Sequence, residues 1–451
     1  LNAMNTLCAG FARVDITPMT GIGIAGYYKP RHVKGILDAL ELNALALQCG
    51  EKRIVLLSLD HCGVHTPEAA AIRAFVAKAC DLSVEAVYLH ATHTHTAPFL
   101  VMDSDDPLER EYFDFVLHRA ADAARYALDD LQPAHMGYAV GSAPNTAFIR
   151  RFRMKDGSIH TNPGVNNPDI VEPIGEVDER VNVLRFDREG ADSLVLVNFG
   201  NHPDTVGGEL VSADWPGFLR RRVEKALDNV RCIFFNGAQG DVNHVNVHPT
   251  AGDFNDLTRD FDDVSRGYGH ARHMGNVVAG AVLQVFDKVT YTDVNSLKFL
   301  QRTIRIPSNM PNPEDLPEAR RIEALHQAGR DCDLPYEGMM LTTVVAEAER
   351  MLKLADGPEY FNMELFGLAV GPVAFVGIPG EPFTGIGRAL KKAPGWTLIL
   401  PTCLTGGDDG YFPMREAYDE GGYEARSSPF RAGVAERIID EGLSLLAELR
   451  D

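Results

Sequence analysis

Residues 53–95 have the sequence RIVLLSLDHCGVHTPEAAAIRAFVAKACDLSVEAVYLHATHTH, in which two short apolar runs flank an amphipathic segment. The first run, 53–60, has the length of a buried strand, and apolar residues then recur with helical spacing from Ile72 to Ala79. The second run, 87–89, ends at the polar cluster 90–95. This order of strand, helix and strand predicts an α/β fold.

The same alternation continues along the chain. Further helices are expected at 107–131, 214–227, 313–328, 341–355 and 431–449, and further strands at 136–140, 181–186, 194–199, 232–235, 297–306, 364–370, 373–378 and 396–400. We therefore expect a mixed β-sheet core with surrounding helices, formed as one catalytic domain over 4–451 with a helical insertion at about 310–356. Leu1, Asn2 and Ala3, ahead of Met4, look like a remnant of an expression vector.

The amino-acid composition and the net charge limit the kinds of molecule that this protein is expected to bind. With 45% hydrophobic and 24% charged residues, the 451-residue chain has the composition of a folded globular protein. Its formal net charge of −20 argues against nucleic acid and against anionic lipid surfaces. No apolar run approaches the ~18 residues of a membrane span, and the seven scattered cysteines suggest reduced thiols. We expect a soluble, cytoplasmic protein with no transmembrane segment that acts on a small molecule.

Two histidines, His93 and His95, follow the strand expected at 87–89. Ligands of α/β sheets bind where strands end, and residues two apart share a face if the strand continues. Neighbouring imidazoles suit a metal ion. The pair alone is equally compatible with metal ligation and with a polar turn.

Three later apolar runs also end in polar residues bracketed by glycine or proline. They lead to His202, to the 236–244 segment NGAQGDVNH with Asp241, Asn243 and His244, and to Glu381. Singly, these are a structural histidine, a tight turn and a surface carboxylate as readily as a site. Their recurrence at strand ends favours one cleft, and two histidines with one carboxylate form a zinc set that leaves room for water. The sequence has no P-loop, no GxGxxG after a strand and no GxSxG elbow.

Taken in order, these motifs resemble the neutral (alkaline, non-lysosomal) ceramidase family. The resemblance begins at Val14 to Pro18 and Gly23 to Tyr27, and covers almost the whole chain. It continues through the segments 93–95, 201–203, 240–242, 379–381 and 410–411.

The resemblance implies roles for individual residues. It implies zinc ligation by His93, His202, Glu381 and Tyr411. It also implies that Tyr423 stabilises the developing oxyanion, that His95 lies near the substrate carbonyl, and that an active-site arginine falls at Arg150 rather than Arg151.

One departure concerns the catalytic serine of the family, whose position is occupied here by Asn243. An amide cannot serve as nucleophile or proton carrier, so either zinc-bound water acts alone or another base contributes. His244, Asp241 and His95 are the candidates. Ceramide-cleaving members of the family usually carry an additional C-terminal β-sandwich domain, whereas this sequence ends with the helix expected at 431–449.

Three functions follow as hypotheses. The first is a zinc-dependent, ceramidase-like amidohydrolase that uses activated water on a small N-acyl compound other than membrane ceramide. The second keeps the metal but makes the protein an esterase, lactonase or phosphoester hydrolase. The third is a metal-binding homologue without catalytic activity.

Overall fold

Most strands belong to two sheets in the computed structural model, which describes residues 6–249 and 267–450. Within these residues the larger sheet has nine strands. Their order is β14 (Val230–Asn236), β12 (Ser193–Phe199), β11 (Arg180–Arg188), β6 (Gln132–Ser142), β1 (Leu7–Asp15), β3 (Glu41–Cys49), β4 (Lys52–Leu59) and β5 (Val87–Ala91), with β16 (Thr290–Thr292) paired to β6. The remnant expected at Leu1 to Ala3 lies outside the described residues.

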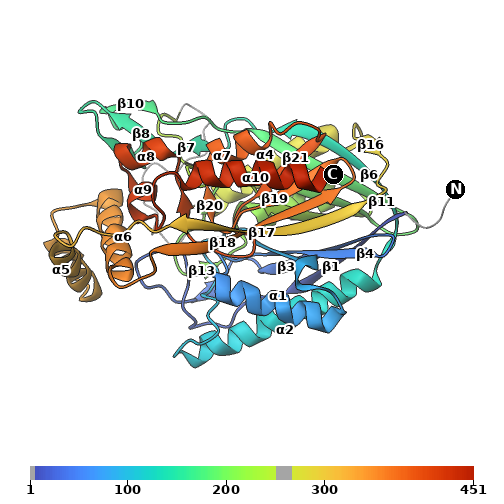
Figure 1. Ribbon diagram of the computed structural model, residues 1–451, viewed down its shortest axis with the longest axis horizontal. Coiled ribbons are helices and arrows are strands. Elements are labelled where there is room, and N and C mark those ends of the chain that lie inside the picture. The colour runs from blue at the N-terminus through green and yellow to red at the C-terminus, as the bar shows by residue number, and fades with distance from the viewer. Residues whose placement is uncertain (1–5, 250–266, 451) are drawn as a thin grey trace.

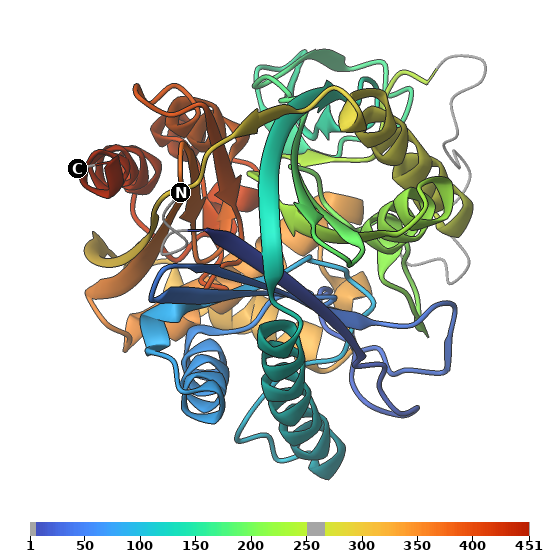
Figure 2. The same ribbon diagram turned by 90° about the vertical axis from the view of Figure 1, so that its right-hand side faces the viewer.

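This sheet divides into two halves. Only the pairs Cys8↔Pro133 and Ala9↔Gln132 join β1 to β6, so the half β1-β3-β4-β5 runs at a steep angle to the half β6-β11-β12-β14 (Figure 2). Each half ends in a parallel pair, β4 with β5 and β12 with β14, while its other neighbours are antiparallel. The ends of β5 and β14 meet, because the backbone N–H of Asn236 donates to the ring of His90 at 3.0 Å.

A second sheet has four strands in the order β17 (Leu297–Pro307), β18 (Tyr360–Val370), β19 (Val373–Gly377) and β21 (Leu398–Thr402). It packs against both halves of the first sheet through one apolar cluster to which all three contribute, including Leu56, Phe235 and Phe375. The core of the molecule is this junction.

Helices cover the outer faces (Figure 1). α1 (Thr66–Cys80) and α2 (Pro107–Asp129) pack on the first half-sheet, and α3 (Asp214–Ala226) and α4 (Tyr268–Phe286) pack on the second. α7 (Thr384–Leu390) and α10 (Val434–Arg450) cover the four-stranded sheet. α5 (Leu316–Gln327) and α6 (Gly338–Ala355) form a hairpin with its own apolar cluster at one end of the molecule.

Short elements lie around the strand ends. They are β2 (Gly35–Ile36) with β13 (Leu210–Val211), β7 (Phe148–Ile149) with β15 (Val242–Asn243), β20 (Glu381–Pro382) with β22 (Tyr411–Phe412), the set β10 (Ile170–Pro173), β8 (Arg151–Met154) and β9 (Ile159–Thr161), and the helices α8 (Arg415–Glu420) and α9 (Tyr423–Ser427). No helix of the described residues has the length and apolar character needed to span a membrane.

The expected mixed α/β class is confirmed, as are the predicted helices and most strand positions. Two details differ. The strand predicted at 396–400 begins at Leu398. The strand leading to His93 ends at Ala91, so the two histidines do not lie on a continuing strand.

Candidate functional site

His93 lies two residues beyond β5 in a left-handed backbone conformation, with φ of 81°. Its backbone N–H donates to the carbonyl of His61 at 2.7 Å, and its Nδ1 lies in a short contact with the carbonyl of Cys62. A carbonyl only accepts, so Nδ1 carries the proton and the lone pair is on Nε2. Both bonds fix the ring with Nε2 facing inward.

His202 is oriented in the same way from the other half-sheet. It lies three residues beyond β12, and its Nδ1 lies 2.9 Å from the carbonyls of Gln239 and Val242. The backbone carbonyls of the 239–242 turn therefore orient the ring of His202. The indole N–H of Trp215 donates to the carbonyl of His202 at 3.2 Å and holds the segment from behind.

Glu381 reaches both histidines from β20, the short strand that follows β19. Its Oε2 lies 3.3 Å from Nε2 of His93 and 3.1 Å from Nε2 of His202. Burial would raise the pKa of Glu381, but the two histidines hold it well below its usual range. Gly380, with φ of 152°, permits the approach, because a Cβ there would lie 2.4 Å from the carbonyl oxygen of Gly410.

Both distances from Glu381 agree with the separation of ligand atoms in a zinc site. Two ligands at about 2.0 to 2.1 Å from a tetrahedral metal lie about 3.3 Å apart. The distances of 3.3 Å and 3.1 Å agree with that separation. All three ligand atoms lie within 4.8 Å of one another and all three residues are buried. The residues present thus fit a divalent metal such as zinc.

Tyr411 lies directly beside Glu381. The parallel pair β20 and β22 sets the two residues opposite each other, so their side chains share one face of the ladder. Arg150 donates from Nη2 to the hydroxyl of Tyr411 at 3.1 Å, and its Nη1 lies 3.4 Å from Nε2 of His202. Burial and the Glu381 carboxylate raise the pKa of Tyr411 well above its usual value, although Arg150 acts in the opposite direction.

Arg150 is itself fixed by Glu424, whose Oε1 accepts from Nε at 2.6 Å. Arg151 points elsewhere, toward Glu420 at 3.1 Å. Of the two arginines, Arg150 is the one that the structure brings to the cluster. The ring of Tyr423 lies 5.5 Å from that of Tyr411 and completes this side.

His95 lies at the edge of the cluster. Its Nε2 is 3.1 Å from Nε2 of His93, but it is outside the set formed by His93, His202 and Glu381. Burial, His93 and His202 lower the pKa of His95 well below its usual value. A neutral ring beside these three residues can accept a hydrogen bond from a bound group or donate one to it.

The candidates in the 240–244 turn have other partners. Both carboxylate oxygens of Asp241 accept from Thr384, at 2.7 Å from the backbone N–H and 3.0 Å from the hydroxyl. Asn243 donates from Nδ2 to Oδ1 of Asn162 at 2.8 Å. The ring of His244 packs edge-on against His270 with centroids 5.2 Å apart. None of these contacts is to the His93, His202 and Glu381 set.

Sequence reasoning overlooked three groups that touch the site. Gln239 donates to Oε2 of Glu381 at 3.2 Å, Glu424 holds Arg150, and Asp204 faces His95 at 3.7 Å. In the sequence, Gln239 precedes the 240–244 turn, Glu424 follows Tyr423 and Asp204 lies two residues after His202. This proximity is the only sign in the sequence that they belong to the site.

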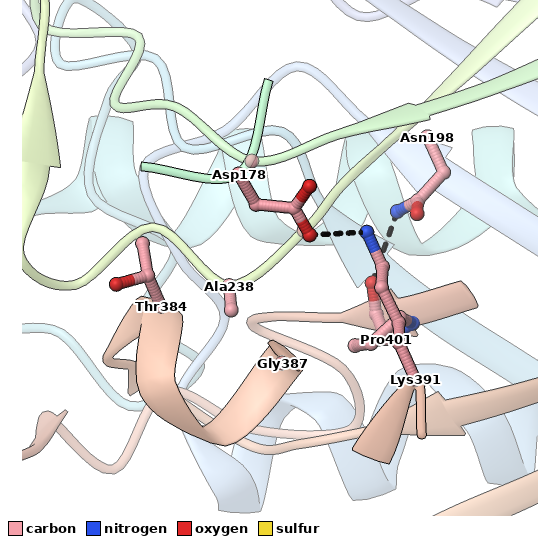
Figure 3. Close-up of a pocket in the computed structure, with 9 residues that line it drawn as sticks. Asp178, Asn198, Ala238, Thr384, Gly387, Lys391 and Pro401 are labelled. Atoms are coloured by element: carbon pink, nitrogen blue, oxygen red, sulfur yellow. Dashed lines mark hydrogen bonds and ion pairs between the residues drawn. The ribbon is translucent and has the colours of Figure 1, made fainter. Parts of the chain in front are cut away.

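A small cavity of about the size of one water molecule lies beside the strand ends, lined by Asn198, Thr384 and Lys391 among others (Figure 3). Nζ of Lys391 donates to Asp178 at 2.8 Å across it. Burial raises the pKa of Asp178, but its bonds to Arg180 and Lys391 dominate and hold it low. This satisfied ion pair supports the fold, and the cavity is distinct from the His93 cluster.

The fold and the cluster together define a mixed α/β protein with a two-histidine, one-carboxylate set at its strand ends. The solved structures show which proteins share this architecture. The neutral ceramidase from Pseudomonas aeruginosa matches with a TM-score of 0.75 and 17% identity over 99% of this chain and 75% of its own. A ceramidase complexed with C2 matches with a TM-score of 0.74 and 16% identity over the same shares. No protein-family model and no curated protein matches the sequence. The chain has the neutral ceramidase fold, as its motifs predicted.

Proposed function

We propose that this protein is a zinc-dependent hydrolase that cleaves the amide bond of small N-acyl compounds. The observation that carries the proposal is the convergence of His93, His202 and Glu381, from three different parts of the sheets, at ligand-pair distances. Tyr411 is the proposed fourth ligand because it pairs with Glu381 across β20 and β22. The neutral ceramidase fold supports amide cleavage.

Bound zinc would supply Lewis-acid polarisation of the scissile carbonyl and activation of water. The side chains provide orientation and charge. Arg150 holds the hydroxyl of Tyr411 and is positioned by Glu424, so the ligand is preset before substrate arrives. Tyr423 lies next to Tyr411, where its hydroxyl can donate to the oxygen that becomes negatively charged, and His95 lies next to His93, where its ring can contact the reacting group.

Asn243 favours water over a side chain as the attacking group. Its amide has no nucleophilic hydroxyl, and its Nδ2 is engaged with Asn162. The net charge of −20 opposes docking on an anionic membrane surface, so we propose a dispersed N-acyl substrate.

Metal analysis tests the proposal directly. We expect about one zinc per chain in the wild type and none in a His93→Ala, His202→Ala variant, because two ligands are lost. The matched control is His118→Ala with His135→Ala, since both histidines are exposed. Equal zinc in all three proteins would refute the site.

Substrate class is tested separately on the zinc-loaded protein. Short-chain N-acyl amides, p-nitrophenyl esters and phosphoesters form the panel. Selective amide turnover is expected. Selective turnover of esters or phosphoesters would favour the second candidate, which rests on the replacement of serine by Asn243. Zinc binding without any turnover would indicate a binding protein.

A further inference from the structure

The loop of residues 26–31 encloses His95. Gly26, with φ of 102°, packs against the ring so closely that a Cβ would lie 2.8 Å from Nδ1. Arg31 donates from Nη2 to the carbonyl of His95 at 2.8 Å. The 26–31 loop therefore fixes both the backbone and the ring of His95.

Asp204 faces the same ring from the segment that follows His202. Its Oδ1 lies 3.7 Å from Nδ1 of His95, a buried nitrogen that makes no hydrogen bond within the described residues. The same oxygen accepts from the hydroxyl of Tyr27 at 2.5 Å. The guanidinium of Arg31 lies 3.8 Å above the ring of Tyr27, which fixes that tyrosine in turn.

The position of the proton on His95 matters because of His93. The two Nε2 atoms are 3.1 Å apart. If His95 carried its proton on Nε2, it would donate to Nε2 of His93 and occupy the lone pair that His93 needs for a metal. His93 cannot avoid this by moving its own proton, because its Nδ1 faces the carbonyl of Cys62. His93 is free to ligate only if His95 carries its proton on Nδ1.

We propose that Asp204, held by Tyr27, is a positioning residue that keeps the proton of His95 on Nδ1. This inference rests on the proposed function, in which His93 ligates the metal. The carboxylate favours the nearby N–H, and such bonds are commonly long before substrate binds. His95 then presents an acceptor nitrogen beside the metal, and His93 keeps its lone pair.

Nitrogen-15 NMR of labelled histidine rings tests the tautomer, with His95 assigned from a His95→Gln variant. In wild type we expect the Nδ1–H form. Asp204→Asn should move His95 toward the Nε2–H form and weaken zinc binding about 10- to 100-fold. Tyr27→Phe should give a smaller change in the same direction. The matched control is Tyr291→Phe, which removes a tyrosine–aspartate hydrogen bond, to Asp187, away from the site.

The readouts separate the two claims. An Nε2–H form in wild type, or an unchanged tautomer and zinc affinity in Asp204→Asn, overturns the role of Asp204. A wild type that hydrolyses no member of the panel overturns the proposed function, while the NMR result still decides the tautomer, with or without zinc. If Asp204→Asn does not fold, Tyr27→Phe decides by the same spectrum.

Discussion

The absence of a side chain at Gly26 determines where the ring of His95 can lie. Its φ of 102° is unfavourable for other residues, and the space that a side chain would need is filled by His95. Gly164 has the same φ of 102° with nothing within 4 Å of the place of a Cβ. The two glycines share the backbone requirement and differ only in what lies next to them.

We predict that Gly26→Ala lowers activity and Gly164→Ala does not, and that Gly26→Ala also loses more stability because its Cβ meets the buried ring of His95. Each pays about 1 to 2 kcal/mol for the left-handed backbone. Only Gly26→Ala pushes the ring of His95 away, and a displacement near 1 Å can lower turnover on the order of 100-fold. Urea unfolding, zinc content and turnover of the best amide measure this. Equal turnover in the two variants would show that His95 does not need its present position.

Among the secondary-structure elements, α3 and β4 are joined by a buried ion pair. Arg220 of α3 donates to both carboxylate oxygens of Asp60, at 3.0 Å from Nη1 and 2.5 Å from Nη2, and Asp60 follows β4. Burial lowers the pKa of Arg220, but Asp60 and Glu41 raise it by more, so the guanidinium stays charged. Because α3 covers the other half-sheet, this pair links the two halves.

Removing one partner should therefore cost more than removing both. Arg220→Met leaves the carboxylate of Asp60 buried without its cation, which is expected to cost about 3 to 5 kcal/mol. A second change, Asp60→Asn, removes that charge and should restore part of the loss. Equilibrium unfolding of the two singles and the double gives the coupling. Simple additivity would mean that the pair does not act as a unit.

Two elements that the sequence analysis did not predict, β1 and α4, contain glycines in close contacts. β1 contains Gly10, where a Cβ would lie 2.0 Å from the carbonyl oxygen of Ala127 in α2, and its Arg13 points into a contact with Glu224. α4 contains Gly275, where a Cβ would lie 2.4 Å from Phe218 of α3. In β1, Gly10 and Arg13 interrupt the apolar residues, so tertiary packing defines that strand. In α4, Ala271, Met274, Val278 and Val282 do recur with helical spacing, so the sequence carried the signal for that helix.

The residues of the candidate site also divide into those that the sequence indicated and those that it did not. The strand ends placed His93, His202 and Glu381 among the candidates, together with His95 and the 236–244 turn, because each follows an apolar strand; the family resemblance then selected the ligand set. Tyr411 came from the family resemblance, since nothing local marks it. The contact of Tyr27 with Asp204 joins residues 177 positions apart through a folded-back loop, and no local pattern encodes such a contact.

At the scale of the whole molecule, stability depends on the junction where the two half-sheets meet the four-stranded sheet. His90 lies there, fully buried, at the end of β5. Its Nε2 accepts the backbone N–H of Asn236 at 3.0 Å, and its Nδ1 lies 3.1 Å from the hydroxyl of Ser58, which donates to the carbonyl of Phe234 at 2.6 Å. The ring joins β4, β5 and β14, and this bonding pattern requires a neutral imidazole with its proton on Nδ1.

Acid should loosen this junction. Burial lowers the pKa of His90 to about 3, against 6.5 for an exposed ring. Between these values the unfolded chain binds a proton that the native chain excludes, so the free energy of unfolding falls as pH decreases. From pH 7 to pH 5 this one group accounts for about 2 kcal/mol. His90→Gln has no such proton to bind, so its loss over that interval should be smaller than that of wild type by this amount. Urea unfolding at the two pH values gives the difference, and equal losses would show that His90 is protonated in the native protein.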